Sequence, residues 1–436
     1  MTAPAAPAGP ATRGQVLAWA LWDWASAAFH AVTLTFVFSV YLVGSVGADL
    51  PGTVSAQAWL GYGLGAAGLT IALLAPVVGR GADAPGRRRW WLGVWTVLTI
   101  AVMAGMAGVR DEPSWFWLGL ALLASGAVFA ELGQVSYNAL LPRVSTPATI
   151  GRVSGLGWAM GYLGGIVLLL GLYVGLLAGD GGLLGVPTED GFAVRLAILV
   201  AAAWFAMFAL PVLLTFPDDP PPAVRPPRTG VVAAYRALLR DVRELYRDAP
   251  HTVYYLGASA VFRDGLVAIF SFGAVLAVTV YGIAPGDVLV FGVAANVAAA
   301  LGALVAGRLD DVVGPKNVIV WALAGMLACG ITLLLVSGPT MFWVFGTALT
   351  VFVGPVQASS RTYLARLCPP GREGQLFGLY ATTGRAVSFL SPTLVGLFTT
   401  MFGSDRAGIA GILLVLAAGL LLLLPVQAPA PYRTAE

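Results

Sequence analysis

The sequence predicts an all-α membrane protein with 12 transmembrane helices in two six-helix halves. Composition, the lengths of the apolar runs and an internal repeat lead to this fold class. Of the 436 residues, 58% are hydrophobic and only 10% are charged, and the mean hydropathy is +0.85. Soluble domains are about 45–50% apolar and about 25% charged. Water cannot accept so much apolar surface, so we expect lipid to surround most of the chain.

The apolar runs indicate the number of helices. A helix that crosses a bilayer needs about 20 mostly apolar residues. Six such runs precede the one long polar segment of the chain, and six follow it. They lie at 16–44, 57–79, 90–109, 114–140, 152–178, 192–216, 252–281, 286–307, 317–337, 339–365, 375–402 and 406–425.

The runs divide the chain into two halves, a linker and two tails. The Pro/Ala-rich N-terminal segment lacks the apolar region and cleavage site of a signal peptide. The linker begins Pro-rich and continues, from Val231 to Asp248, with leucines on one helical face and arginines on the other, which is typical of a helix on a membrane surface. We expect a disordered tail at 1–15, an N-terminal half at 16–216, a cytoplasmic linker with an amphipathic helix at 217–251, a C-terminal half at 252–425 and a second tail at 426–436.

Basic residues indicate which side of the membrane each loop faces. With 12 spans both termini share a side, and that side carries 19 of the 24 Lys and Arg residues. The opposite side carries Arg110, Arg195 and Arg406, while Arg263 and Arg385 fall inside spans. The positive-inside rule therefore places both termini and the linker in the cytoplasm.

Two sequence patterns recur in the two halves. "GRGADAPGRR" (79–88) follows the second run and "GRLDDVVGPK" (307–316) follows the eighth. "GRVSGLGWAMG" (151–161) begins the fifth run and "GQLFGLYATTG" (374–384) begins the eleventh. Halves that repeat with the same side toward the cytoplasm are related by an axis along the membrane normal, and transporters of this kind bind substrate between the halves.

The loop after the second run fits the pattern G-x3-D-x2-G-R-[RK], and in it the chain resembles the major facilitator superfamily (MFS). The resemblance implies the MFS fold and a gating role for this loop and its degenerate second copy. Glycines allow helices to approach closely, and an aspartate can meet a helix N-terminus and arginines in a latch that breaks when the transporter changes shape. The residues concerned are Gly79, Asp83, Gly86, Arg87 and Arg88, with Gly307, Asp311, Gly314 and Lys316 in the second copy.

Several longer segments carry a narrower resemblance. They are "WDWASAAF" (22–29), "GRVSGLGWAMGYLGG" (151–165), "FRDGL" (262–266) and the block 354–392. With these segments the chain resembles the UMF1 family of the MFS, the bacterial relatives of the Atg22-like vacuolar amino-acid effluxers. It departs from the family pattern at Trp22, Ser26 and Ala27, and Arg385 stands where a lysine is frequent.

Ionisable residues inside spans are costly and mark functional sites by default. Asp23, Glu131 and Asp264 lie in three of the four helices that the resemblance implies line a central cavity, and Gln357 lies in the fourth. Helical spacing places Asp23, Ser26 and His30 on one face, and it does the same for Glu131, Gln134 and Asn138. We therefore expect a shared polar cleft. Its candidate substrate or proton-coupling residues are Asp23, Ser26, His30, Glu131, Gln134, Asn138, Asp264, Gln357 and Arg385.

Their roles stay open between two interpretations each. Asp23 either latches a closed state or contacts cargo. Glu131 carries a proton unless Arg385 holds it ionised, and Arg385 either binds a carboxylate or phosphate or forms a structural salt bridge. His30 is a proton relay or a polar cavity residue. Asp264 is expected to face the cavity, with Arg263 reaching another span because neighbours on a helix point about 100° apart.

The sequence predicts a secondary active transporter that moves a small polar or zwitterionic metabolite by alternating access. The family resemblance makes an amino acid the first guess, with H+ or Na+ as the coupling ion. We expect a monomer in a bacterial cytoplasmic (inner) membrane. Efflux of hydrophobic or amphipathic compounds, and a membrane sensor that transports nothing, remain as alternatives.

No feature of the sequence predicts an enzyme. The two histidines and two cysteines are far apart, and no G-x4-G-K-[ST] pattern occurs. We therefore expect no catalytic residues, no metal, no cofactor and no nucleic-acid partner.

Overall fold

The computed structural model describes residues 11–83, 87–179, 181–216, 231–369 and 371–427, apart from the side chains of 231–234, 285, 286 and 289. It confirms the predicted fold class, because 12 of the described helices are long and apolar enough to cross a membrane. Each predicted apolar run overlaps one of these spans.

The N-terminal half supplies the first six spans. They are α1 (Arg13–Ala27) continued by η1 (Ala28–Phe36), α2 (Phe38–Tyr41) and η2 (Leu42–Val46); α3 (Ala56–Ala82); α4 (Arg88–Met106); η3 (Pro113–Trp115) with α5 (Phe116–Asn138); α7 (Ile150–Leu172) with η4 (Tyr173–Leu177); and η5 (Glu189–Gly191) with α8 (Phe192–Thr215). The short α6 (Leu141–Val144) connects the fourth and fifth spans.

The C-terminal half supplies the other six. They are α10 (Pro250–Thr279), α11 (Pro285–Val313), α12 (Pro315–Leu335), α13 (Pro339–Leu367), α14 (Glu373–Val387) with α15 (Leu390–Phe402), and α16 (Asp405–Leu423). Proline begins α10, α11, α12 and α13, where its missing N–H costs nothing because the first N–H groups of a helix have no partner within the helix.

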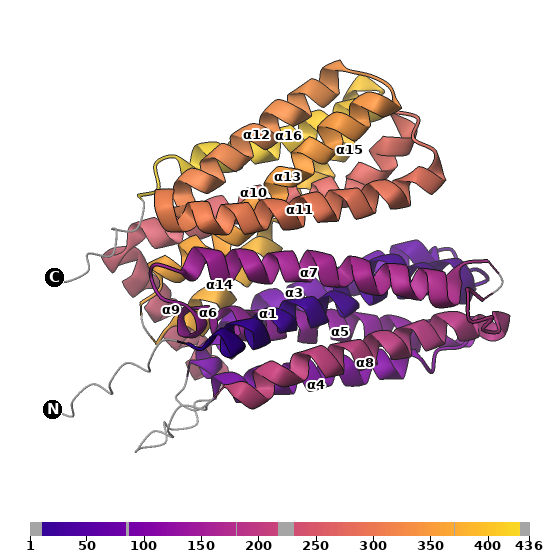
Figure 1. Ribbon diagram of the computed structural model, residues 1–436, viewed down its shortest axis with the longest axis horizontal. Coiled ribbons are helices and arrows are strands. Elements are labelled where there is room, and N and C mark those ends of the chain that lie inside the picture. The colour runs from indigo at the N-terminus through magenta and orange to yellow at the C-terminus, as the bar shows by residue number, and fades with distance from the viewer. Residues whose placement is uncertain (1–10, 84–86, 180, 217–230, 370, 428–436) are drawn as a thin grey trace.

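The halves form two bundles that touch at one end (Figure 1). Contacts between them come mainly from α7 against α11 and from α3 against α14. Toward the opposite end the C-terminal bundle tilts away from the N-terminal one (Figure 1). We call the touching end the basic end. It is the end at which α3, α5, α11 and α13 finish and α7 and α14 begin, and it carries Arg80, Arg88, Arg152, Arg308, Lys316 and Arg366.

The first and the eleventh spans depart from a regular α-helix within their length, and the fifth ends in a π-helix, η4. In the first, Ala28–Phe36 is a π-helix, whose wider turns change which residues share a face. In the eleventh, the helix breaks between Val387 and Leu390. Pro392 explains the break, because its ring excludes a continuous helix through the carbonyl four residues earlier.

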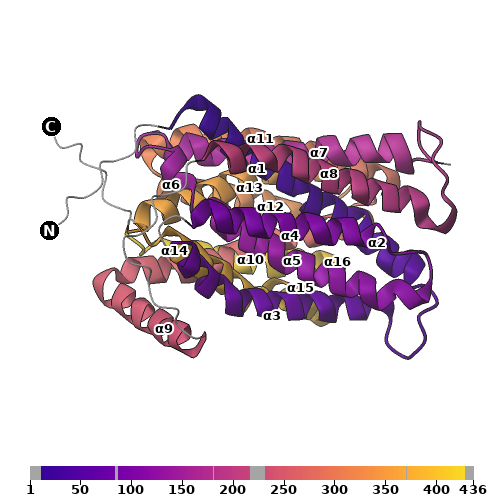
Figure 2. The ribbon, with the colours of Figure 1, turned by 90° about the horizontal axis from the view of Figure 1, so that it is seen from below.

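The linker helix α9 (Val231–Asp248) lies outside the bundle, across its basic end (Figure 2). Leu238 is buried, whereas Leu239 and Tyr246 are exposed. Asp241 connects the helix to both bundles, lying 3.4 Å from Arg80 Nη1 and accepting from Gln375 Nε2 at 3.1 Å. The first part of the expected linker, 217–230, lies outside the described residues.

Candidate functional site

A charged pair from the two halves lies inside the bundle. Arg385 on α14 donates from Nη2 to Oε2 of Glu131 on α5 at 2.6 Å. The Arg385 side chain is 40% exposed and that of Glu131 is 19% exposed. An ion pair that solvent reaches is less costly to separate than a dry one. Glu131 and Arg385 can therefore separate and bind the charged groups of a ligand in place of each other.

Two more basic side chains accompany this pair. Arg263 and His30 both lie close enough to Glu131 to act on its charge. The Arg263 guanidinium lies 3.7 Å above the Tyr380 ring and donates to the Tyr380 carbonyl at 3.1 Å. We call Glu131, Arg385, Arg263 and His30 the central cluster. It combines one carboxylate with two guanidinium groups and an imidazole, so it carries an excess of positive charge.

A second ion pair closes the space between the halves nearer the basic end. Arg361 on α13 donates from Nη1 to Oδ2 of Asp23 on α1 at 3.0 Å. The two residues are 2% and 8% exposed. The same guanidinium donates to the Ser154 carbonyl at 2.6 Å and to Asn138 Oδ1 at 3.3 Å. We call Asp23 and Arg361, with Ser154 and Asn138, the gate. Four hydrogen-bonding groups on both halves fix its geometry.

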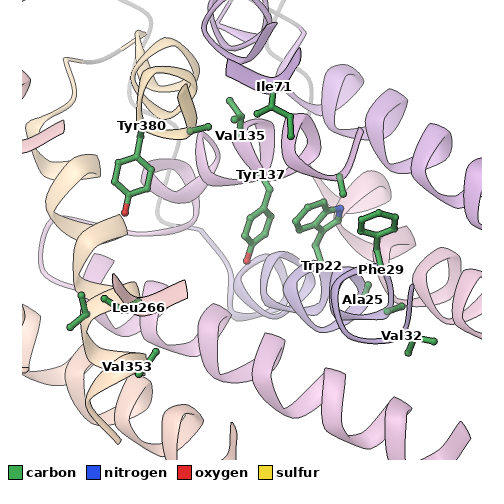
Figure 3. Packing of buried hydrophobic residues seen from close by; sticks show 14 of the residues in the cluster. Trp22, Ala25, Phe29, Val32, Ile71, Val135, Tyr137, Leu266, Val353 and Tyr380 are labelled. Atoms are coloured by element: carbon green, nitrogen blue, oxygen red, sulfur yellow. The ribbon is translucent and has the colours of Figure 1, made fainter. Parts of the chain in front are cut away.

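Aromatic packing holds Asp23 in place from its own half. The Tyr137 ring stacks between Trp19 and Trp22, at centroid distances of 4.4 and 4.5 Å. Figure 3 shows Tyr137 beside Trp22 in this buried region. The Tyr137 hydroxyl donates to Asp23 Oδ2 at 2.9 Å. Trp19 and Trp22 are almost fully buried, so they orient the gate and do not face a cavity.

The loop repeat forms two latches at the basic end. Asp83, which follows α3, accepts hydrogen bonds from the backbone N–H groups of Gly374 at 2.7 Å and Gln375 at 2.8 Å, at the start of α14. Arg88 lies 3.1 Å from Asp83 and 2.5 Å from Glu373. A carboxylate at a helix N-terminus satisfies free N–H groups and opposes the helix dipole. We call these residues the Asp83 latch.

The second copy repeats this geometry with the halves exchanged. Asp311, at the end of α11, accepts from the backbone N–H groups of Gly151 at 2.9 Å and Arg152 at 3.1 Å, at the start of α7. The Arg152 side chain lies 3.1 Å from Asp311, and that of Arg366 lies 3.3 Å from it. We call these residues the Asp311 latch. Each half therefore caps a helix of the other.

Glycines make the contact between the halves close. A Cβ on Gly79 would lie 2.0 Å from the carbonyl oxygen of Gly374, and one on Gly155 would lie 2.4 Å from that of Ala303. Real Cβ atoms essentially never approach this closely. The glycines of the repeated patterns therefore serve helix packing across the two halves.

The structure divides most of the predicted residues between the central cluster and the gate. Glu131, Arg385 and His30 belong to the central cluster, whereas Asp23 and Asn138 belong to the gate. Ser26 donates to the Asp23 carbonyl, and Gln134 donates to Asn138. Asp23 and Ser26 are buried while His30 is exposed, so the three residues do not share one face as expected. The π-helix that begins at Ala28 is the physical reason.

Asp264 and Gln357 lie outside the central cluster and the gate. Asp264 is 6% exposed, and its Oδ2 accepts from the Ser391 N–H at 2.7 Å, where the eleventh span breaks. It therefore caps α15. Arg263 reaches another span, as expected, because it contacts Tyr380 on α14, and from there it also acts on the charge of Glu131. Gln357 is half-buried on α13.

The remaining loop residues of the repeat are placed as follows. Arg87 is exposed and precedes α4, and Gly307 packs against the Gly151 carbonyl. Gly314 has φ +86° between α11 and α12, and Lys316 donates to the carbonyls of Leu424 and Val426. Gly86 lies outside the described residues.

Sequence reasoning missed Arg361, which it counted among the basic residues of the cytoplasmic side. Arg361 lies within α13, six residues before the helix ends at Leu367. Its position inside the apolar run 339–365 was the available signal. Among the described residues, no group of three or more His, Cys, Asp or Glu side chains could hold a metal ion.

Comparison with known proteins identifies the family of this arrangement. The family model "Vacuole effluxer Atg22 like" matches residues 50–436. The chain belongs to the Atg22-like family. It is therefore an MFS transporter and an integral membrane protein, as its resemblance to the UMF1 and Atg22-like proteins predicted.

Curated relatives of this Atg22-like chain come from bacteria and fungi. The uncharacterized MFS-type transporter YxiO of Bacillus subtilis is 24% identical over 412 residues, covering 93% of each chain. The autophagy-related protein 22-1 of Aspergillus fumigatus is 24% identical over 303 residues. That match covers 63% of this chain and 48% of the fungal protein, so the chain spans about half the length of this relative.

Solved structures share the fold of this Atg22-like chain at low sequence identity. The proton:xylose symporter XylE has a TM-score of 0.69 at 13% identity, with 94% of each chain covered. The MFS transporter FucP in its outward conformation has a TM-score of 0.65 at 14% identity, with 94% of this chain and 99% of FucP covered.

Proposed function

We propose that this MFS transporter moves a small polar metabolite that carries a carboxylate, with an amino acid as the first candidate. The observation that supports this cargo is the Glu131–Arg385 pair, which joins the two halves and remains partly exposed. A cargo carboxylate would compete for Arg385, and a cargo ammonium group would compete for Glu131. Both partners of the internal pair thereby match the two ends of a zwitterion.

The position of the pair suits alternating access. Glu131 precedes Asn138 by seven residues on α5, so it lies about 10 Å farther from the basic end than the gate does. The gate and both latches close the path on the basic side, while the bundles diverge on the other (Figure 1). A ligand at the central cluster would therefore exchange with the side opposite the basic end. Opening the gate and latches would reverse this access.

Arg263 makes the carboxylate the more important part of the cargo. Arg385 has a carboxylate partner within the protein, whereas the contacts of Arg263 are the ring and carbonyl of Tyr380. A guanidinium binds a planar carboxylate through two parallel hydrogen bonds. An anionic group of the cargo would balance the positive excess of the central cluster. This favours carboxylates over neutral sugars.

Charge distribution and relatives support the cellular setting. The positive-inside rule assigns the basic end to the cytoplasm, and a bacterial relative aligns over nearly the whole chain. We therefore propose a bacterial cytoplasmic membrane, an outward-facing arrangement in this structure, and function as a monomer. Coupling to H+ or Na+ would involve Glu131, whose pairing with Arg385 a bound ion or proton would change.

Binding and flux measurements test the cargo. Purified protein is screened by thermal shift against amino acids, small carboxylates, sugars and nucleosides, and each hit is followed by uptake into proteoliposomes. We expect carboxylate-bearing compounds to stabilise the protein, and we expect Arg385→Ala to reduce uptake more than tenfold, the factor that corresponds to about 1.4 kcal/mol. Arg385→Lys should retain part of the uptake because it keeps the charge without the guanidinium fork.

The control is Arg110→Gln, an exposed arginine at the opposite end of the bundle. It should transport like the wild type. Near-normal uptake by Arg385→Ala and Arg263→Gln would contradict the assigned cargo. Saturation by apolar competitors with both variants active would instead indicate efflux of hydrophobic compounds. Ligand binding without flux in any direction would indicate a sensor.

A further inference from the structure

Asp310 is a buried acid that neither the gate nor the latches use. It lies in the last turn of α11, directly before Asp311, and its exposure is 0%. Ser359 on α13 donates to Asp310 Oδ1 at 2.6 Å. Within the part of the chain that the structure describes, Asp310 Oδ2 has no hydrogen-bond partner and no contact with solvent. The Thr362 hydroxyl is near the carboxyl group but donates to the Ala358 carbonyl at 3.0 Å.

Arg366 acts on the charge of Asp310, but its hydrogen bonds go to other acceptors, and its Nε is buried without a hydrogen-bond partner among the described residues. On α13, Arg366 directs Nη2 to the backbone carbonyl of Asp310 and to the carboxylate of Asp311, both at 3.3 Å. On α7, Arg152 is 56% exposed and contacts Asp311. On α11 itself, Asp311 adds a like charge beside Asp310. Burying a carboxylate without a cation or enough donors is costly, and the usual resolution is protonation.

The repeat shows that the fold does not need an acid at this position. In the aligned patterns "GRGAD" and "GRLDD", Asp310 corresponds to Ala82 of the N-terminal half. Ala82 is also 0% exposed. Both copies therefore bury this position, and the first copy does so with a methyl group. The acid in the second copy has no counterpart in the architecture that it shares with the first.

Burial of Asp310 depends on contact between the halves. A Cβ on Gly151, in the first turn of α7, would lie 2.5 Å from the Cβ of Asp310, so α7 covers the acid directly. Asp311 holds this end of α7 through the Gly151 and Arg152 N–H groups. Separation of α7 from α11 would therefore expose Asp310 to water. A hydrated aspartate beside Arg366 is ionised at neutral pH.

We propose that Asp310 is a proton-binding site, protonated while the basic end is closed and ionised when the halves separate there. The proton is taken from and returned to the solution on the basic side, and no other bond forms or breaks. Because the closed state binds one proton more than the open state, acidification of the basic side favours closure. The site adds pH sensing to the transport cycle, and it does not depend on which cargo the central cluster binds.

Two measurements without any cargo test this site. Infrared spectroscopy detects the C=O stretch of a protonated buried carboxyl group, and spin labels at Ala148 and Val312, both exposed, report the separation of α7 from α11. The labelled protein carries Cys329→Ser and Cys368→Ser so that the introduced cysteines alone react. The variants are Asp310→Asn, which keeps the shape, and Asp310→Ala, which copies Ala82. The control is Asp405→Asn, an exposed acid at the start of α16.

We expect the wild type and Asp405→Asn to show the carboxyl band near neutral pH and both Asp310 variants to lack it. The open fraction of the wild type should fall as the pH is lowered from about 9 to about 6, by at most tenfold per pH unit because one proton is involved. Both Asp310 variants should show a smaller dependence over this range. The proposal is wrong if the wild type lacks the band, if the Asp310 variants keep it, or if their pH dependence matches the wild type. None of these outcomes bears on the cargo, which the uptake assay tests separately.

Discussion

The Asp83 latch and the Asp311 latch share one design and differ in their surroundings. In each, an aspartate at the end of the second span of one half accepts two backbone N–H groups from the fifth span of the other. In the Asp83 latch, Arg88 is 5% exposed and has a second carboxylate partner in Glu373. In the Asp311 latch, Arg152 is 56% exposed and the additional acid is the unpaired Asp310.

This difference indicates that the two latches have separate tasks. A buried arginine with two carboxylates keeps one partner if the other is lost, so the Asp83 latch is redundant. The Asp311 latch has no second carboxylate that contacts its arginines among the described residues. It instead places a protonatable group under the helix that it holds. The two halves share the same latch geometry, and only the Asp311 copy places a second, unpaired acid beneath the helix that the latch holds.

A steric change at the close glycine contacts should have the largest effect. Gly79→Val in the α3–α14 contact and Gly155→Val in the α7–α11 contact each place side-chain atoms where backbone already lies. We expect either variant to hold the basic end open and to reduce transport to background. Spin-label distances between Ala148 and Val312 measure the opening, and uptake into proteoliposomes measures the transport.

Each of these glycine-to-valine variants has a control in its own helix. Gly65 on α3 and Gly171 on α7 have nothing within 4 Å of a built Cβ. Gly65→Val and Gly171→Val should therefore leave the distance distribution and the uptake close to wild type. An unchanged distribution for Gly79→Val would show that the α3–α14 contact is not required for closure.

Removing the carboxylates should show the redundancy of one latch. Asp83→Ala and Asp311→Ala each lose two backbone N–H partners, and we expect each to disfavour closure by about 2 kcal/mol, or roughly 30-fold. Adding Glu373→Gln to Asp83→Ala leaves the buried Arg88 without a carboxylate partner. We expect this to disfavour closure by about a further 3 kcal/mol. Both effects are read from the open fraction in spin-label distances.

The matched double variant is Asp311→Ala with Arg152→Ala. Arg152 is mainly solvated, so it should add less than about 1 kcal/mol to the effect of Asp311→Ala alone. The distinction between the latches would be contradicted if the second substitution disfavoured closure by the same amount in the two double variants. Strict additivity for Asp83→Ala with Glu373→Gln would do the same.

The smallest expected effect is the pH response of the Asp83 latch itself. Burial raises the pKa of Asp83 to about 6, although the Gln375 and Gly374 N–H groups and Arg88 act to lower it. In an open state the carboxyl group is hydrated and titrates near its ordinary value of 3.8. The closed state therefore holds the proton more tightly, and lowering the pH from about 7 to about 5 should favour closure by up to roughly tenfold. In an Asp310→Asn background this response should remain, and Asp83→Asn should remove it.

The sequence predicts the spans, the repeat and the latch residues. It does so within each half separately. Hydropathy identifies helices because lipid requires each span to be apolar along its length. The two repeated patterns also mark the correct contact surfaces. Neither pattern indicates that Asp83 caps α14 or that Asp311 caps α7, because a repeat describes each half alone. Contacts across the halves follow from how the bundles meet.

The division of the polar residues shows the same limit. Regular helical spacing places Asp23, Ser26 and His30 on one face, but His30 lies in the π-helix from Ala28 to Phe36 and is exposed, whereas Asp23 and Ser26 are buried. The pairing of Glu131 with Arg385, one of the two alternatives that the sequence leaves open, is present, and Arg263 acts on the charge of Glu131 as well. The sequence places Arg361 with the basic residues of the cytoplasmic side, because a basic residue near a span end fits the positive-inside rule. Its burial and its contact with Asp23 depend on tertiary packing.

The stacking of Tyr137 between Trp19 and Trp22 has a kinetic consequence. Tyr137 belongs to the same half as Asp23, so its hydrogen bond to the carboxylate does not require contact between the halves. The acceptor of the gate therefore stays oriented throughout the cycle, and re-forming the ion pair requires no search among Asp23 rotamers. Pre-organisation of this kind removes part of the entropic cost of association. Closure at the basic end is then limited by the rigid-body motion of the bundles, and the gate re-forms as soon as they meet.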